Sequence, residues 1–199
     1  MNAFPQRRGI KAALLAVVSM VMAGAFVLSA PLAAEAAGSP TILRAWQDAG
    51  GRSVFVRSGV YNGSTGFGMA KIQQRHKIYS IDSVVFVTKN PNGGVKEGDD
   101  RRYDAYANKK VCQNGTCTYT ESVPVRVIMS NTYVGTYYGV VVNGALGIKT
   151  AYCTTDAAAL DCPSWVDQAL AGVASRTVEG QSETVWSYQP VAIGQAVSE

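Results

Sequence analysis

The sequence is poor in the residue types that most often mark a metal centre. It has one histidine, His76, and four cysteines, whose spacings within each neighbouring pair, four and eight intervening residues, are irregular for zinc. No internal repeat is present. We therefore predict no cofactor and no metal site.

Net charge is also small. The chain has 18 Lys and Arg against 14 Asp and Glu, and three of these cations and one acid lie in the first 36 residues. The remainder has 15 cations and 13 acids, close to neutrality. A general electrostatic attraction to nucleic acid is therefore weak. The basic isoelectric point of the whole chain overstates it, because that value includes the first 36 residues.

The amino-terminal segment has the order of a signal peptide. Arg7, Arg8 and Lys11 precede an uncharged apolar run over 12–28, and small residues follow up to Ala34-Glu35-Ala36. The run also reaches the lower limit for a membrane span, and the adjacent arginines loosely match a twin-arginine signal. The small residues that end this segment favour cleavage near Ala36, so we expect a secreted protein with no stable membrane span.

The segment beyond the signal is long enough for one domain with a substantial core. We expect a flexible leader over 37–40, one secreted globular domain over 41–190 and a frayed tail over 191–199.

All four cysteines lie in the exported part, where an even number predicts disulfides. Asn114-Gly115 lies between Cys112 and Cys117, so a tight turn can bring these two together. We favour Cys112 with Cys117, and Cys153 with Cys162.

Turn signals and residue preferences divide the first half of this domain. We predict a strand over 53–57, a turn over 62–66 and a short helix over 67–77. Residues 80–89 suit either a capped helix or a buried strand, and periodicity leaves both open. Asn90 to Gly94 is a break, followed by an exposed polar loop over 96–102.

The middle of the chain reads as strands joined by hairpins, over 103–111, 118–120, 123–129, 137–142 and 145–153. Along 125–130 apolar residues alternate with others, so one face of a sheet is apolar and Arg126 lies on the other. A helix over 164–170 and a strand over 185–188 follow. The predicted fold is α+β, with a short N-terminal helix or helices packed on an antiparallel β-sheet and two local disulfides.

One local cluster can carry chemistry. Lys71 and Arg75 are four residues apart, on one face of the predicted 67–77 helix, and His76 follows at its end. An imidazole beside cations suits phosphodiester cleavage without a metal, because the imidazole moves a proton at the ribose 2′-hydroxyl and the cations stabilise phosphate charge. A lone histidine is more often a structural residue, and that interpretation stays open.

A resemblance adds to this hypothesis. Gly66-Phe67-Gly68, a Lys-Ile-x-x-Arg-His helix, an Asn-Pro break and a sheet ending in Gly147-Ile148-Lys149-Thr150-Ala151-Tyr152 together look like the ribonuclease toxins grouped with barnase, EndoU and the colicin nucleases. The resemblance covers about residues 54–155. It implies metal-independent RNA cleavage, RNA and an immunity protein as partners, and His76 as acid or base, supported by Arg75, Arg126, Thr150 and Tyr152.

Two other functions remain open. Gln181-Ser182-Glu183 is similar to the Gln-x-Glu of toxins that transfer ADP-ribose from NAD, although Arg57 and Ser64-Thr65 follow one another too closely for that family. Ten tyrosines on a disulfide-bridged sheet also suit a non-enzymatic secreted binding module, such as an adhesion protein, an inhibitor or a subunit of an extracellular assembly.

Overall fold

Three helices pack on antiparallel sheets in the part of the chain that the computed structural model describes, residues 38–155, 160–172 and 182–198. The smaller sheet has the order β1-β2-β3, formed by β1 (Ser39–Gln47), β2 (Ser53–Tyr61) and β3 (Gly66–Phe67). The larger sheet has the order β4-β5-β6-β7, formed by β4 (Val95–Glu97), β5 (Asp100–Gln113), β6 (Thr116–Tyr137) and β7 (Val140–Cys153). Two short strands complete it: β8 (Ser182–Ser187) pairs with β5, and β9 (Ala196–Ser198) pairs with β6.

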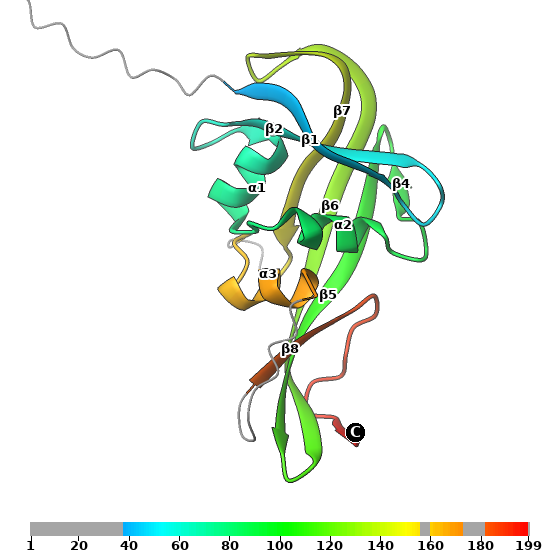
Figure 1. The fold of residues 1–199 in the computed structure, drawn as a ribbon, viewed down its shortest axis with the longest axis vertical. Helices are drawn as coiled ribbons and strands as arrows, with labels where there is room; N and C mark the ends of the chain where they lie inside the picture. Colours follow the sequence, from blue (N-terminus) through cyan, green and yellow to red (C-terminus); the bar gives the residue numbers. More distant parts are fainter. Residues whose placement is uncertain (1–37, 156–159, 173–181, 199) are drawn as a thin grey trace, which may run out of the picture. The chain divides into compact units, whose positions relative to one another are not determined.

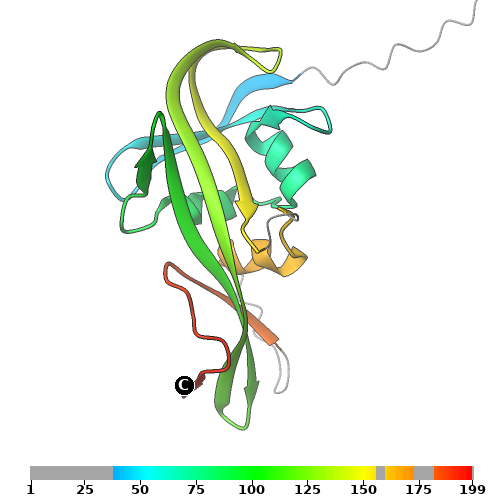
Figure 2. The ribbon, with the colours of Figure 1, turned by 180° about the vertical axis from the view of Figure 1, so that it is seen from behind.

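The helices are α1 (Gly68–His76), α2 (Ile81–Thr88) and α3 (Ser164–Leu170). They lie, with β1 and β2, on one side of the long sheet, and α1 runs beside the edge strand β7 (Figure 1). The opposite face of β5, β6 and β7 is turned towards the viewer in Figure 2. The predicted α+β class with helices packed on an antiparallel sheet is therefore confirmed.

The core lies between the helices and one face of the long sheet. Val125, Val127 and Met129 on β6 are at most 1% exposed, and they alternate with half-buried residues, as the sequence predicts. Residues from all three helices fill the other side of this core, among them Ile72, Val84 and Val166. The residues that alternate with the buried ones on β6, including Arg126, therefore lie on the opposite face of the sheet, which is seen in Figure 2.

The ambiguous segment over 80–89 is a helix. Ser80 accepts a hydrogen bond from the Asp82 amide at 3.1 Å, which caps the amino end of α2. Near the other end, the Thr88 hydroxyl donates to the carbonyls of Val84 and Val85. The β-branched run is buried because the sheet and α3 cover it on different sides, so tertiary packing overrides the strand preference of valine.

The predicted strand over 137–142 is wrong: β6 ends at Tyr137 and β7 begins at Val140, so the hairpin turn lies at 138–139 and Asn143-Gly144 is inside β7. Three further segments, predicted as loop, tail and leader, contain strand. The predicted loop over 96–102 is mostly a hairpin, because Lys96 pairs with Arg101 in the β4–β5 ladder while the side chains stay outside the core. The predicted tail over 191–199 contains β9, whose Val197 pairs with Cys117. The predicted leader over 37–40 already contains strand, since Ser39 pairs with Gly59. Backbone pairing accounts for all three, and residue polarity does not reveal it.

Both predicted disulfides are present. Cys112 pairs with Cys117 across the β5–β6 turn, and Cys153 at the end of β7 pairs with Cys162 just before α3. Two disulfides are compatible with an extracellular protein. The predicted signal peptide over 1–36 lies outside the described residues. None of the helices in the described ranges combines the length and apolar composition that a membrane crossing requires.

The turn between β1 and β2 is fastened to the long sheet through one buried carboxylate. Asp48, whose side chain is fully buried, accepts hydrogen bonds from the Tyr103 hydroxyl at 2.8 Å, from the Arg52 guanidinium at 2.8 Å and from the Gly50 and Arg52 amides. Burial opposes ionisation of Asp48, but these donors outweigh it and hold its pKa below the ordinary value.

The start of α1 depends on a glycine. Gly68 has φ of +71°, and a Cβ there would lie 2.6 Å from the Arg57 carbonyl oxygen of β2. We expect Gly68→Ala to lower the free energy of unfolding by about 2 kcal/mol, since it combines left-handed backbone strain with overlap against backbone. Denaturant titration measures this. Gly135→Ala, where the nearest atom lies 3.9 Å away, is the matched control, and equal losses in both variants would contradict the prediction.

Candidate functional site

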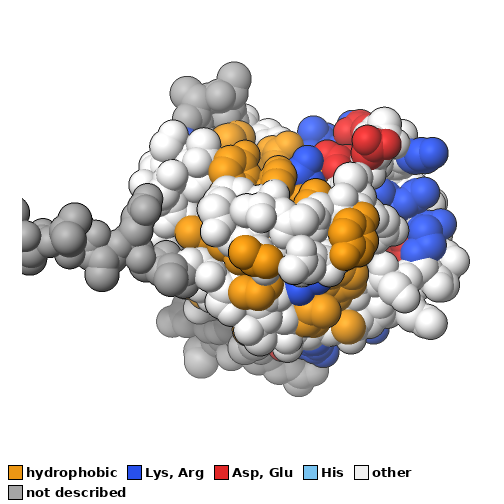
Figure 3. Space-filling view, turned by 90° about the horizontal axis from the view of Figure 1, so that it is seen from above, with side chains coloured by type: hydrophobic (Ala, Val, Ile, Leu, Met, Phe, Trp, Pro, Cys, Tyr) orange, Lys and Arg blue, Asp and Glu red, His pale blue; other side chains and the backbone are white. Residues whose placement is uncertain are grey.

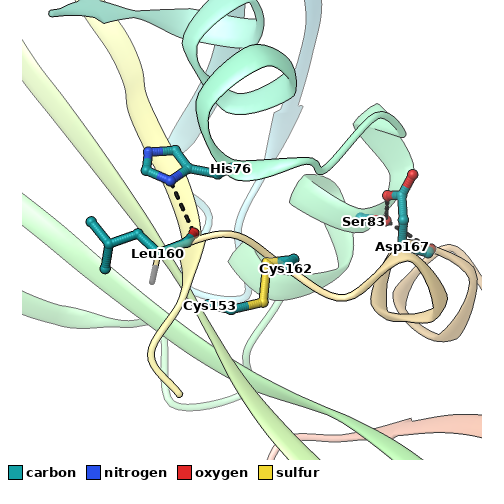
Figure 4. Close-up of a disulfide and its surroundings, with 6 residues drawn as sticks. All are labelled: His76, Ser83, Cys153, Leu160, Cys162 and Asp167. Atoms are coloured by element: carbon teal, nitrogen blue, oxygen red, sulfur yellow. Dashed lines mark hydrogen bonds between the residues drawn. A yellow bond between two sulfur atoms is a disulfide. The ribbon is translucent and has the colours of Figure 1, made fainter. Parts of the chain in front are cut away.

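His76 is the last residue of α1 and is held by the segment that precedes α3. Its Nδ1 lies 3.0 Å from the Leu160 carbonyl oxygen, and its own carbonyl accepts a hydrogen bond from the Cys162 amide at 3.0 Å (Figure 4). Because a carbonyl only accepts, Nδ1 carries the proton and Nε2 carries the lone pair. His76 is only 2% exposed, and its Nε2 is buried without a hydrogen-bond partner among the residues that the structure describes.

The surroundings of His76 favour the neutral ring. Burial lowers the pKa of His76 most, because a protonated imidazole is poorly solvated there. The Leu160 carbonyl and Asp161 act in the opposite direction, whereas Lys71 and Arg75 lower the pKa further. The net shift is below the ordinary value of 6.5, so the imidazole is neutral at pH 7 and its Nε2 is a proton acceptor.

Tyr152 connects His76 to a polar row across the long sheet. Its ring centroid lies 5.6 Å from that of His76. Tyr152 is paired with Arg126, and Arg126 with Asp104, so the three side chains lie in one row on β7, β6 and β5. Arg126 Nε donates to Asp104 Oδ1 at 2.8 Å. Burial disfavours the guanidinium charge, but Asp104 and the Tyr152 hydroxyl outweigh this and raise the pKa of Arg126.

A group of cations lies where α1 packs against β7. The pKa of Lys71 is lowered by partial burial, then by Lys149 and by Arg75. Lys149 pairs with Asp100 at 2.7 Å, and Arg75 pairs with Asp161 at 3.5 Å. Within the described residues Lys71 has no acidic partner. Positive charge without full compensation is therefore concentrated beside His76, as an anion site requires.

Thr150 lies two residues before Tyr152 on β7. It is paired with Ile128, two residues from the Arg126–Tyr152 pair, and so has the same orientation on the strand. Its Oγ1 is buried without a hydrogen-bond partner in the structure. Buried polar atoms without partners are rare in folded proteins, and both Thr150 Oγ1 and His76 Nε2 are covered by neighbouring side chains.

The predicted site residues thus gather around the junction of α1 with β7 and β6. Tyr152 contacts His76 and Arg126 directly, and Lys71 and Arg75 act on His76 electrostatically. Thr150 shares the face of Tyr152, but no contact joins it to His76. Sequence reasoning missed four partners: Asp104, Lys149, Leu160 and Asp161. A backbone carbonyl leaves no sequence signal, and Asp104 requires the strand register.

Other candidate residues lie elsewhere. Glu183 is on β8 and pairs with Lys110 at 3.1 Å, and Gln181 lies outside the described residues. Arg57 is buried and donates to the carbonyls of Pro40 and Ala145. Over the described ranges, no group of three or more His, Cys, Asp or Glu side chains is placed to hold a metal ion.

The buried neutral histidine makes stability sensitive to acid. Below about pH 6.5 the unfolded chain protonates His76, while the folded site still favours the neutral ring. Stability from this source is therefore present above the unfolded pKa and is lost as the pH falls through the folded pKa. Denaturant titrations over this pH range should show the loss, and His76→Gln should remove that part of the slope. A slope unchanged in the variant would contradict this origin.

Comparison of the chain with protein-family models, with curated proteins and with solved structures found no match.

Proposed function

We propose that this protein is a metal-independent ribonuclease whose site is formed by His76, Tyr152, Arg126 and the cations at the junction of α1 and β7. One observation carries the proposal: a neutral imidazole, anchored through Nδ1, presents an unpartnered Nε2 beside cations. An imidazole that has to act as a general base at neutral pH needs this protonation state and tautomer.

The reaction follows from the roles of these groups. Nε2 of His76 accepts the proton of the ribose 2′-hydroxyl, whose oxygen attacks the adjacent phosphorus. The bond from phosphorus to the 5′ oxygen breaks, and solvent protonates the leaving oxygen. Lys71 and Arg126 stabilise the negative charge that develops on the phosphate. The products are a 2′,3′-cyclic phosphate and a 5′-hydroxyl.

Burial of His76 adds a requirement. At 2% exposure the imidazole is reached only when a covering side chain moves. Tyr152 is the candidate for this movement, because its ring lies next to the imidazole. It pairs with Arg126 and so lies on the same face of the sheet, the face seen in Figure 2. We assign this face to RNA binding, since it also presents Arg126.

The proposal extends to an exported toxin. The predicted signal peptide and the two disulfides support action outside the producing cell. An exported toxin acts on RNA in a competitor, and an immunity protein protects the producer.

RNA cleavage in the presence of a chelator tests the activity. The folded protein is incubated with a single-stranded RNA and a metal chelator, and the ends of the products are analysed. We expect fragments that end in 2′,3′-cyclic phosphate. Intact RNA after incubation with protein of native circular dichroism would overturn the proposal.

Protein binding is a second candidate function, favoured by the tip of the β6–β7 hairpin. Tyr133, Tyr138 and Val141 are 72%, 48% and 59% exposed there. Figure 3, which looks onto the molecule from above relative to Figure 1, shows hydrophobic side chains at the surface in several places. Aromatic side chains of this kind are enriched at protein interfaces. A stoichiometric complex that forms with His76→Ala and is lost with Tyr133→Ser would favour this function.

A further inference from the structure

The Cys153–Cys162 disulfide joins the two segments that supply the contacts of the His76 ring. Cys153 directly follows Tyr152, whose ring centroid lies 5.6 Å from that of the imidazole. Cys162 is two residues from Leu160, whose carbonyl receives Nδ1–H (Figure 4). The bridge therefore joins the strand that carries Tyr152 to the segment that carries Leu160.

Three consecutive residues beside this bridge hold the end of α1. Leu160 accepts from His76 Nδ1, Asp161 pairs with Arg75, and the Cys162 amide donates to the His76 carbonyl. All three contacts join residues 160–162 to the last two residues of α1, Arg75 and His76. Cys162 is 6% exposed and Cys153 is fully buried, so the bridge belongs to the packed core rather than to the surface.

The far end of the same segment is fastened independently of the disulfide. Asp167 of α3 accepts hydrogen bonds from the Ser83 hydroxyl at 2.5 Å and from the Tyr79 and Ser80 amides at 3.0–3.1 Å. Val166 and Leu170 are buried in the core. When the bridge opens, α3 therefore keeps its attachments, and the effect concentrates on residues 160–162 and on the imidazole.

We propose that the Cys153–Cys162 disulfide is a redox control of the candidate site, which orders His76 only in the oxidised chain. Reduction breaks the S–S bond and produces two thiols, with two electrons and two protons taken from a dithiol that itself becomes a disulfide. The reduced segment releases Leu160 from Nδ1, so the ring loses its fixed tautomer. In a reducing compartment the chain then has a disordered site, and oxidation after export orders it.

This inference rests on the proposed ribonuclease for its consequence, but the ordering of His76 is measurable without RNA. The groups that act on the imidazole are Lys71 and Arg75 of α1, Asp161 of the bridged segment and Tyr152 of β7. Opening the bridge removes the cover supplied by residues 160–162. Since burial is the largest influence on the ring, the pKa of His76 should rise towards 6.5.

The test follows the single histidine by NMR in two matched double variants. Cys153→Ser/Cys162→Ser opens the bridge beside His76. Cys112→Ser/Cys117→Ser opens the bridge of the β5–β6 turn, which lies away from α1 in Figures 1 and 2. We expect the His76 titration to move towards pH 6.5 in the first variant alone, with RNA cleavage reduced at least about tenfold. A titration that is unchanged, or that moves equally in both variants, overturns the proposal.

The wild-type protein provides a second measurement in case the first variant does not fold. Ring ¹⁵N shifts of the oxidised protein should report Nδ1–H. Because the bridge is buried, the reduced form is prepared by unfolding and refolding in dithiothreitol, and it should show a tautomer mixture. An Nε2–H tautomer in the oxidised protein overturns the proposal. A titration that responds to the bridge, in a protein that leaves RNA intact, supports the control of His76 and rejects the ribonuclease, so the two failures are distinguishable.

Discussion

Replacing His76 by alanine should slow RNA cleavage by about 10²- to 10⁴-fold, the range that a positioned general base contributes. The variant removes the only side chain at this junction whose neutral form accepts a proton near neutral pH. Initial rates on a short RNA, with enzyme in excess, measure the effect on the chemical step. Loss of the Leu160 contact also costs stability, so each variant is compared at a temperature where its near-ultraviolet circular dichroism is native.

The wild-type pH profile supplies a further check. The rate should rise with pH through the lowered pKa of His76 and level off above about 6.5, since only the neutral imidazole accepts the proton. Lys77→Gln is the matched control, because Lys77 is adjacent, exposed and outside the site. A His76→Ala variant that cleaves at the wild-type rate would rule out this catalytic role.

Asp48→Ala should lower the free energy of unfolding by about 3 kcal/mol, because several hydrogen-bond donors lose one buried acceptor. The substitution leaves the Tyr103 hydroxyl and the amides of Gly50 and Arg52 without their acceptor, and the Arg52 guanidinium without its counterion. Denaturant titration at neutral pH measures the loss.

A surface carboxylate shows that burial is the cause. Asp82 also pairs with an arginine, Arg44, but both side chains are about half exposed or more, at 61% and 47%. Exposed pairs of this kind contribute at most about 1 kcal/mol, so Asp82→Ala should have a small effect. Comparable losses in the two variants would contradict the importance of the buried network around Asp48.

Local sequence signals predicted most of the fold. The 67–77 helix is confirmed within one residue at each end, because a turn follows β2 and good helix formers come after it. The 164–170 helix is confirmed at both ends. Both disulfides follow from short spacing and, for Cys112, from the Asn-Gly turn. These features depend only on neighbouring residues.

What the sequence left open depends on distant partners. Residues 81–88 are helical because Ser80 caps them and Asp167, far along the chain, holds their first turn. The partner of Arg126 is Asp104, which the β5–β6 register selects among several acidic residues. Leu160 contributes a carbonyl rather than its side chain. Strand register and backbone contacts can be read only from coordinates. The sequence therefore predicted the side chains of the candidate site, but not the carboxylate and the carbonyl that hold them in place.

The outer strand of the smaller sheet bears on how the protein avoids self-association. β1 pairs only with β2 among the described strands, and it exposes about half of Ile42 and of Leu43. An exposed apolar edge of this kind is a template for aggregation. The two register shifts along β1, together with Pro40 and the charge of Arg44, interrupt the regular edge on which a second chain would add a strand. Straightening this strand, rather than weakening the core, is therefore the change most apt to turn the protein into fibrils.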